Sequence, residues 1–251
     1  MSELIFQIRS IRKTYKDRKV NKLITFPSMQ IERGKITVIK GETGIGKTTL
    51  LNMLGLMDQM IFTNDDEIFF YPQKGETILY SNLFVKKRKM IEKIRRKYFG
   101  FMFQHDHLID SWTGWQNVIL PYIIRYPRQS LDKPIAQVKK IINECHFVDM
   151  LKILNRSPST YSGGQRQRTA LLRALIHHPD VIFVDEPFAS VPLKRAEEIL
   201  NVLKEQTYKG VTTVMVAHDI HDQLFNDANL NKFNLIEENK KEFTKITVKE
   251  G

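Results

Sequence analysis

The chain has 251 residues, of which 42% are hydrophobic, so it can bury one large core, with or without an inserted part. Its 39 basic and 28 acidic residues give a net charge of +11, which favours an anionic partner, whether nucleotide, nucleic acid or lipid surface. A single cysteine, Cys145, excludes an internal disulfide and suits a reducing cytosol, and we expect it to be a small buried apolar residue. No apolar run approaches the roughly 20 residues that span a bilayer, and no secretion leader is evident, so a soluble chain is expected.

The first part of the chain is predicted to consist of short strands and two helices. Runs rich in β-branched residues predict strands at 4–8, 25–31 and 35–40. Leucines and methionines at helical spacing predict a helix over 47–56 that stops near Gly55, and turn signals predict a small β-rich segment over 58–80. A second helix is predicted over the basic run 86–97, with charges all around its axis. We interpret this run as a solvated face, with contact to an anionic membrane leaflet as the alternative.

The second part of the chain alternates buried strands with helices. The stretch from about 104 to 160 is predicted to be mostly helical and to form an inserted part. After it, helices are predicted over 165–176 and 193–204, and buried strands over 181–184 and 211–216. This alternation implies a mainly parallel sheet that is covered on both faces, which is an α/β fold.

A glycine-rich segment, GETGIGKTT, lies between a predicted strand and a predicted helix. The spacing GxxxxGK[ST] in that context predicts a phosphate-binding loop. Glycines let backbone N–H groups turn toward phosphate oxygens, Lys47 reaches the β and γ phosphates, and Thr48 offers a hydroxyl to Mg²⁺. The predicted nucleotide-binding residues of this loop are Gly41, Glu42, Thr43, Gly44, Ile45, Gly46, Lys47, Thr48 and Thr49.

An aspartate and a glutamate follow four apolar residues in VIFVDEP. Asp185 ends the predicted strand 181–184, where a carboxylate can face the phosphate loop across a parallel sheet and provide a second contact to Mg²⁺. Glu186 comes next and places a second carboxylate at the same strand end. The alternative, a surface pair of acids at a strand end, is weak beside a phosphate loop.

Three further motifs complete an ordered set: FMFQ ending at Gln104, YSGGQRQR from Tyr161, and VAHD around His218. With the two above, this set resembles the ATP-binding cassette (ABC) ATPases, and the resemblance runs from about Ile5 to about Leu224. It implies one domain, 1–251, with a phosphate-loop (RecA-like) core, an antiparallel β subdomain and an inserted α-helical subdomain. The core and β subdomain are expected over 1–103 and 165–251, and the helical subdomain over 104–164.

The resemblance also implies roles for residues at matching positions. Glu186 polarises the attacking water, Gln104 reaches Mg²⁺ or that water, and His218 touches the γ-phosphate and orients the glutamate. Tyr15 lies where an aromatic ring stacks on adenine, although it could equally be a half-exposed packing residue. The implied cofactors are ATP and Mg²⁺, the latter held by Thr48, Gln104 and Asp185.

The signature YSGGQRQR opens a predicted helix, whose amino end favours an anion. By resemblance, it grips the γ-phosphate of an ATP that is held on a second subunit, so the active form is a head-to-tail dimer with two ATP molecules. The residues acting in this way are Ser162, Gly163, Gly164 and Gln165.

The chain departs from the family pattern at two places. Pro192 replaces an aspartate that crosses the dimer interface, so hydrolysis is expected to survive with altered coupling between the two ATP sites. Tyr161 replaces a leucine, which we expect to change only local packing. The remaining histidines are interpreted as ordinary polar or surface residues: His105, His107, His146, His177, His178 and His221.

The segments LLNMLGLMD, FGFMFQHDHLI and WQNVILPYII are similar to the LolD, MacB and FtsE branch of the family, which serves lipoprotein release, macrolide or peptide export and cell division. The predicted function is an ATP-hydrolysing subunit that powers a membrane transporter from the cytoplasmic side of the inner membrane. Its expected partners are membrane-spanning permease subunits and a second ATPase subunit, either another copy or a relative. One alternative is an FtsE-like signal to cell-wall remodelling. The other, a soluble nucleic-acid-associated ABC ATPase, is suggested by charge alone, and nucleic acid is not expected as a partner.

Overall fold

The computed structural model describes residues 3–16, 21–58, 60, 66–84, 88–188, 192–217, 224–225, 230–240 and 243–250. Two predicted site residues are affected by these gaps. His218 lies outside the described residues, as does the side chain of Tyr15, whose backbone belongs to strand β2.

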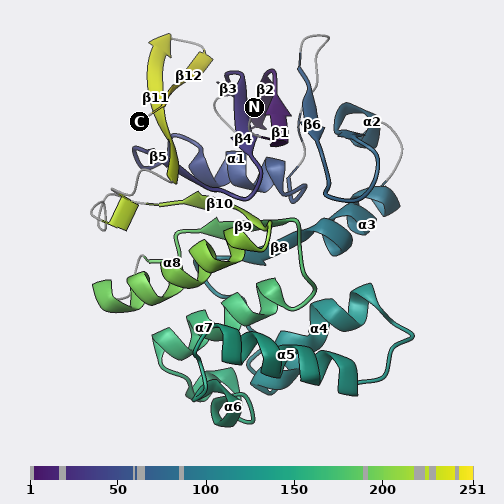
Figure 1. Ribbon diagram of the computed structural model, residues 1–251. Coiled ribbons are helices and arrows are strands. Elements are labelled where there is room, and N and C mark those ends of the chain that lie inside the picture. Colours follow the sequence, from purple (N-terminus) through teal and green to yellow (C-terminus); the bar gives the residue numbers. More distant parts are fainter. Residues whose placement is uncertain are drawn as a thin grey trace.

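A mixed sheet of eight strands carries the fold (Figure 1). Its strands, from one edge to the other, are β2 (Ile11–Lys16), β3 (Asn21–Phe26), β12 (Phe243–Glu250), β11 (Leu230–Lys240), β5 (Ile36–Gly41), β10 (Thr212–Val216), β9 (Val181–Asp185) and β8 (Phe99–Met102). The strands from β11 to β8 run parallel to one another. Every residue of β9 and β10 is buried, as expected for parallel strands that are covered on both faces. The predicted α/β class is confirmed.

Successive residues of the central strands face opposite layers of helices. Val181 and Phe183 of β9 belong to the same apolar cluster as Leu50 of helix α1 (Lys47–Leu54). Ile182 and Val184 belong to a second cluster, which includes residues of α8 (Leu193–Tyr208) and α7 (Gly163–Leu175). In this part of the sheet one face is therefore covered by α1 and the other by α7 and α8, and a site can form at the ends of the strands.

A second sheet has four antiparallel strands in the order β4, β1, β6 and β7. Their bounds are β4 (Met29–Glu32), β1 (Leu4–Ile8), β6 (Ile68–Phe70) and β7 (Ile78–Leu79). The prediction of one strand over 25–31 was wrong, because β3 ends at Phe26 and β4 begins at Met29 in the other sheet. Pro27 lies at the break and has no N–H to donate, so it interrupts the ladder. The predicted β-rich segment is confirmed by β6 and β7.

The two sheets meet through aromatic side chains. The ring centroid of Phe6 on β1 lies 5.0 Å from that of Phe70 on β6, 6.4 Å from Phe99 on β8 and 6.3 Å from Phe183 on β9. Phe99 and Phe183 pack edge to face at 5.2 Å, the arrangement that aromatic quadrupoles favour. This cluster fixes the four-stranded sheet against the parallel strands that carry the site.

Helices fill the interval between β8 and the second half of the parallel sheet. They are α4 (Gly114–Arg125), α5 (Asp132–Glu144), α6 (Met150–Ile153) and the short 3-10 helix η1 (Pro158–Thr160), and they gather around α7 (Figure 1). Cys145 follows α5 and is buried, and burial raises the pKa of its thiol to about 12. The expectation of a small buried apolar cysteine is thus confirmed.

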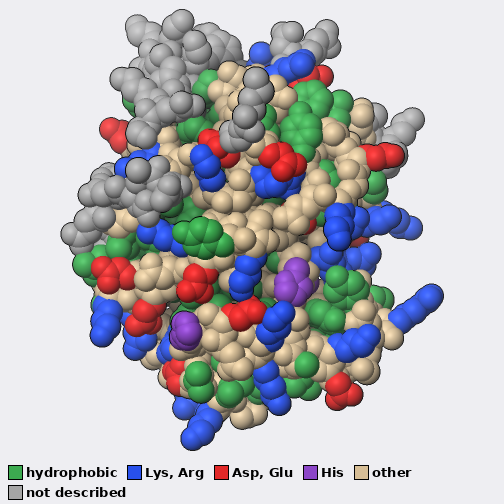
Figure 2. Space-filling model, viewed as in Figure 1, with side chains coloured by type: hydrophobic (Ala, Val, Ile, Leu, Met, Phe, Trp, Pro, Cys, Tyr) green, Lys and Arg blue, Asp and Glu red, His purple; other side chains and the backbone are tan. Residues whose placement is uncertain are grey.

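The basic run forms helix α3 (Arg88–Tyr98), preceded by the single turn α2 (Ser81–Phe84). The helix is confirmed, but its charges do not encircle it. Ile94 and Tyr98 are buried, and Ile91 packs beside them, because these residues share one face at intervals of three and four. Lys and Arg side chains gather on the outer side of α3 (Figure 2). Within the described part of the chain, no helix combines the length and the apolar content that crossing a bilayer requires.

Candidate active site

The phosphate loop joins β5 to α1, and glycines make its path possible. Gly41 has φ 143°, and a Cβ at this position would lie 2.7 Å from the carbonyl oxygen of Leu235 on β11. Gly46 has φ 109° and lies at the capping position just before α1, where no side chain caps the helix. A helix that begins without a cap leaves its first N–H groups directed at a ligand, and its dipole makes that end favourable for an anion.

Lys47 is the first residue of α1 and is only 5% exposed. Its Nζ donates to the carbonyl oxygens of Gly41 at 2.8 Å and Glu42 at 3.0 Å, the first two residues of the loop. The ammonium group is therefore held at the loop itself, where a phosphate oxygen could take over one of these contacts. Glu42, Thr43 and Gly44 are exposed beside it.

Thr48 and Asp185 come together from opposite halves of the sequence. The Thr48 hydroxyl donates to Oδ1 of Asp185 at 3.0 Å, across the 137 positions that separate them in the chain. Asp185 is the last residue of β9 and is 8% exposed. A hydroxyl and a carboxylate side by side are hard oxygen donors, which is the donor set that Mg²⁺ prefers.

Glu186 follows β9 in a left-handed backbone conformation, with φ 45°. Such a conformation is uncommon for a residue with a side chain and persists only when its surroundings enforce it. Here its N–H donates to the carbonyl oxygen of Val216 on β10 at 3.0 Å. The Nε2 of Gln104 donates to Oε2 of Glu186 at 2.8 Å. Two residues predicted to share one reaction therefore touch.

The signature motif begins α7 with reciprocal capping. The Ser162 hydroxyl accepts from the N–H of Gln165 at 3.4 Å, and the side chain of Gln165 accepts from the N–H of Ser162 at 3.0 Å. A Cβ at Gly163 would meet nothing within 4 Å, so this end of the helix is open. The capping box satisfies two of the backbone N–H groups at the start of α7 and leaves other N–H groups available to a ligand.

The same helix makes contacts that the sequence did not predict. Gln167 donates to the carbonyl oxygen of Pro187 at 2.7 Å and so joins α7 to the residue that follows Glu186. Arg166 and Arg173 both donate to the segment that comes after Gln104. The sequence did hold a signal for these arginine contacts, because residues 166 and 173 fall on the same face of the predicted helix.

Two interpretations of individual side chains were wrong. Tyr161 does more than replace the bulk of leucine, because its hydroxyl lies 2.8 Å from the carbonyl oxygen of Ile153 and 3.0 Å from that of Arg156. His177 is not an ordinary surface residue. It is 3% exposed with Nε2 2.9 Å from the carbonyl oxygen of Phe99, and burial lowers the pKa of its imidazole to about 4.

Pro192 is the residue immediately before α8, and it offers no side-chain cap to that helix. Its backbone, with φ −59° and ψ 147°, has the extended conformation of a residue at this position. The three residues that link it to Phe188 lie outside the described part of the chain.

Comparison with known proteins decides the family. The model of the family described as "ABC transporter" matches residues 25–189. The chain is a member of this family. It is 33% identical to the bacitracin export ATP-binding protein BceA of Halalkalibacterium halodurans, covering 86% of this chain and 79% of that protein. It is 31% identical to the lipoprotein-releasing system ATP-binding protein LolD of Rickettsia bellii, covering 87% and 90% of the two chains.

A solved structure extends the comparison to the fold. The dimeric ATP-binding cassette MJ0796, in a post-hydrolysis state bound to ADP and Pi, aligns over 95% of this chain and 96% of its own, with a TM-score of 0.72 and 29% identity. This ABC chain is thus an ATP-binding, ATP-hydrolysing subunit of a membrane transporter, as predicted. The expected resemblance to the LolD branch is confirmed. Neither the cell-wall signalling alternative nor the nucleic-acid alternative is favoured by these relatives.

Proposed function

We propose that this ABC chain hydrolyses ATP as one half of a head-to-tail dimer, and that Gln104, Asp185 and Glu186 act together on the γ-phosphate. The observation that carries this proposal is the 2.8 Å hydrogen bond between Gln104 and Glu186 beside the Thr48–Asp185 pair. In this arrangement residues 41–49 hold the phosphates. The exposed loop backbone and the Lys47 ammonium supply the positive partners that a triphosphate requires.

The oxygen donors fit Mg²⁺. Thr48 and Asp185 would hold the ion, with Gln104 close to it, and phosphate oxygens would complete its shell. Such an ion, when bound, neutralises charge that develops on the transferred phosphoryl group. Among the described residues there is no cluster of three or more His, Cys, Asp or Glu that could hold a metal.

Glu186 is proposed as the general base. Its carboxylate accepts the proton of a water molecule as the water oxygen attacks the γ-phosphorus, and the ADP oxygen departs on the opposite side. The Gln104 amide orients the carboxylate by donating to Oε2, so that Oε1 is the oxygen proposed to face the water. His218 and Tyr15 keep their predicted contacts to the γ-phosphate and to adenine as part of this proposal.

The second half of each site is proposed to come from another copy of the chain. Ser162, Gly163 and Gly164 present an open helix end with a positive dipole, which suits the γ-phosphate of an ATP bound across the interface. Gln165 is occupied by the capping box in this structure and would shape that end. The dimeric state of the MJ0796 cassette supports this arrangement. A relative in place of the second copy is the alternative outcome.

The docking point for a membrane-spanning subunit is proposed to lie next to Gln104, between the core and the helical part 104–164. A cavity of about 250 Å³ opens between β8, α4 and α7. Its lining is Phe99, Gly100, Phe101, Phe103, His107, Pro121, Arg173, Ala174 and His177. An apolar helix end of a permease would fill it and press on the residue that precedes Gln104. The chain would then lie peripherally on the cytoplasmic side of the inner membrane.

The experiment is to isolate the full chain from its native membranes in mild detergent and to identify co-purifying proteins by mass spectrometry. A stoichiometric multi-spanning permease is expected. Phe103→Asp should lose that partner, since Phe103 lines the cavity, whereas Val148→Asp, at a residue that is 62% exposed on the helical part, should retain it. Recovery in the soluble fraction with nucleic acid would contradict the docking proposal while leaving the ATP chemistry intact.

A further inference from the structure

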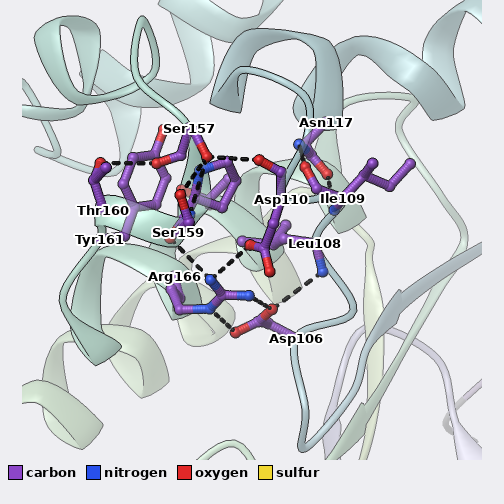
Figure 3. A network of polar contacts seen from close by, with 12 residues as sticks. Asp106, Leu108, Ile109, Asp110, Asn117, Ser157, Ser159, Thr160, Tyr161 and Arg166 are labelled. Atoms are coloured by element: carbon purple, nitrogen blue, oxygen red, sulfur yellow. Dashed lines mark hydrogen bonds and ion pairs between the residues drawn. The ribbon is translucent and has the colours of Figure 1, made fainter.

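The segment that follows Gln104 is fastened to α7 by the guanidinium group of Arg166 (Figure 3). Nε and Nη2 of Arg166 donate to the two carboxylate oxygens of Asp106, at 2.7 and 2.9 Å. Nη1 donates to Oδ1 of Asp110 at 2.9 Å and to the carbonyl oxygen of Pro158 at 2.8 Å. All three nitrogens of the group are therefore in use, and the two-pronged contact to Asp106 fixes its direction.

The surroundings of Asp106 favour its ionised carboxylate in this contact. Its side chain is 18% exposed, and its Oδ1 also accepts from the N–H of Leu108 at 3.1 Å. Burial alone would raise the pKa of Asp106. The hydrogen bonds from Arg166 and Leu108, together with the charges of Arg166 and Arg173, outweigh burial and lower that pKa from its ordinary value.

A second arginine of α7 holds the backbone of the same segment. Arg173 lies two turns beyond Arg166 on the same face of the helix. It donates to the carbonyl oxygen of Asp106 and, at 2.7 Å, to that of His107. One helix thus binds both the side chains and the backbone of the segment that follows Gln104. The segment cannot shift along α7 without breaking several charge-assisted hydrogen bonds at once.

Both ends of this contact lead to the ATP site. Gln104, which touches Glu186, is two residues before Asp106. Ser162, which caps α7, is four residues before Arg166. The Arg166–Asp106 contact therefore lies within a few residues of two parts of the site. Gln104 is proposed to serve the ATP on its own subunit, and the signature motif is proposed to serve the ATP on the other subunit.

We propose that Arg166, acting through Asp106, is a positioning residue that sets Gln104 and the amino end of α7 in one fixed relation. This proposal rests on the roles proposed above for Gln104 and the signature motif. Hydrolysis then depends on the Arg166–Asp106 pair, whereas the affinity of the phosphate loop for ATP does not. A docked permease that displaces the segment after Gln104 would therefore move Gln104 and the amino end of α7 together.

A comparison within α7 separates positioning from simple stabilisation. Arg168 makes an ion pair of similar length, 2.9 Å, with Asp149 immediately before α6. That pair joins α7 to the start of α6 and does not involve the segment 105–110. Arg168→Gln therefore removes one ion pair from the same helix and serves as the matched control for Arg166→Gln.

The test uses the full chain and four variants: Arg166→Gln, Asp106→Asn, the double variant and Arg168→Gln. The turnover number and KM for ATP are measured, together with the Kd for ATP in EDTA, where hydrolysis stops. Loss of the pair should lower kcat by about 10-fold to 100-fold, the scale expected when a reacting group is displaced by an ångström. The Kd should stay within about twofold of the wild-type value, because the phosphate loop is untouched. The double variant should be no slower than the slower single variant, because both changes remove the same contact.

Wild-type turnover in Arg166→Gln, multiplicative losses in the double variant, or an equal loss in Arg168→Gln would each overturn the proposal. Should Arg166→Gln fail to fold, the isosteric Asp106→Asn decides the question alone by its kcat and Kd. A different result would reject the proposed function itself, namely normal turnover in Glu186→Gln. An inactive Glu186→Gln beside a fully active Arg166→Gln rejects the positioning role only.

Discussion

The Gln104 amide donates to the Glu186 carboxylate at 2.8 Å, although 82 positions separate the two residues in the chain. The register of two neighbouring parallel strands explains the contact. Met102 at the end of β8 is the partner of Val184 on β9, and Gln104 and Glu186 each lie two residues further along the chain from these partners. Because parallel strands end at the same edge of a sheet, groups placed there from distant segments converge on one site.

Glu186→Gln tests the proposed base. The amide keeps the size and one hydrogen bond of the carboxylate but accepts no proton, so turnover should fall by about 10² to 10⁴ while ATP affinity is unchanged. Light scattering should then detect an ATP-bound dimer that persists. Glu198→Gln on α8, where the glutamate pairs with Arg195, should leave turnover unaltered. Wild-type turnover in Glu186→Gln would remove this residue from the mechanism.

Lys47→Ala should act at the binding step instead. Removing an ammonium that makes charge-assisted contacts is expected to weaken ATP binding by about 10-fold to 100-fold. Calorimetric titration with ATP in EDTA measures this effect without hydrolysis. Lys35→Ala is the control, because Lys35 stands at the opposite end of β5 and pairs with Glu32. Unchanged affinity in Lys47→Ala would count against the phosphate-loop assignment.

Pro192→Asp should change two properties at once. Aspartate at the uncapped start of α8 can accept from a backbone N–H of the first turn, so it should be more stable than Pro192→Ala by about 1 kcal/mol in urea unfolding. The carboxylate would also restore the aspartate that, by the resemblance given above, we expect to cross the dimer interface. We therefore expect Pro192→Asp to change the cooperativity of hydrolysis with ATP concentration. Pro192→Ala should keep the wild-type cooperativity. Identical kinetics in both variants would make this position a bystander.

Gly114 and Tyr161 should be coupled. A methyl group at Gly114 would collide with the Tyr161 hydroxyl and lie 2.7 Å from a methyl carbon of Leu154. Overpacking of this kind costs about 1–3 kcal/mol, so Gly114→Ala should lower the free energy of unfolding by that amount. Tyr161→Phe removes the hydroxyl, and the double variant should be less destabilised than the sum of the singles. Additive losses would show that Leu154 alone causes the strain.

The burial of His177 should give stability a dependence on pH. Its native pKa, about 4, is below the ordinary value of 6.5, so between these pH values the unfolded chain binds a proton that the native chain does not. Stability therefore falls as pH drops through this window, by at most about 1.4 kcal/mol per pH unit. His177→Gln should flatten that part of the curve relative to wild type. The exposed His105→Gln should reproduce the wild-type slope, and an unchanged slope in His177→Gln would reject the explanation.

The features that sequence alone predicted are those set by short, local patterns. The loop around Lys47 needs glycines at fixed spacing, and Asp185 needs only an apolar run before it, so the residues themselves were enough to place both. The central strands were found because a strand buried on both faces is a continuous apolar run.

The features that were missed depend on partners distant in sequence. Strands β11 and β12 are rich in charged and polar residues and acquire their conformation by pairing with β5 and β3. His177 is buried because α7 ends against Phe99, which no periodicity in the sequence reveals. The Arg166–Asp106 contact joins two polar segments across 60 positions, and a charged pair is equally compatible with two solvated side chains.

Strand β5, which leads into the phosphate loop, has β10 on one side and β11 on the other. Both neighbours are made of residues beyond position 210, so a growing polypeptide cannot surround β5 when the loop itself emerges. The entropy of closing such long loops must be met before any of these pairings forms. Leu235 is the partner of Gly41 in this register, so the sheet around the start of the phosphate loop is complete only when the chain beyond position 210 has paired with β5.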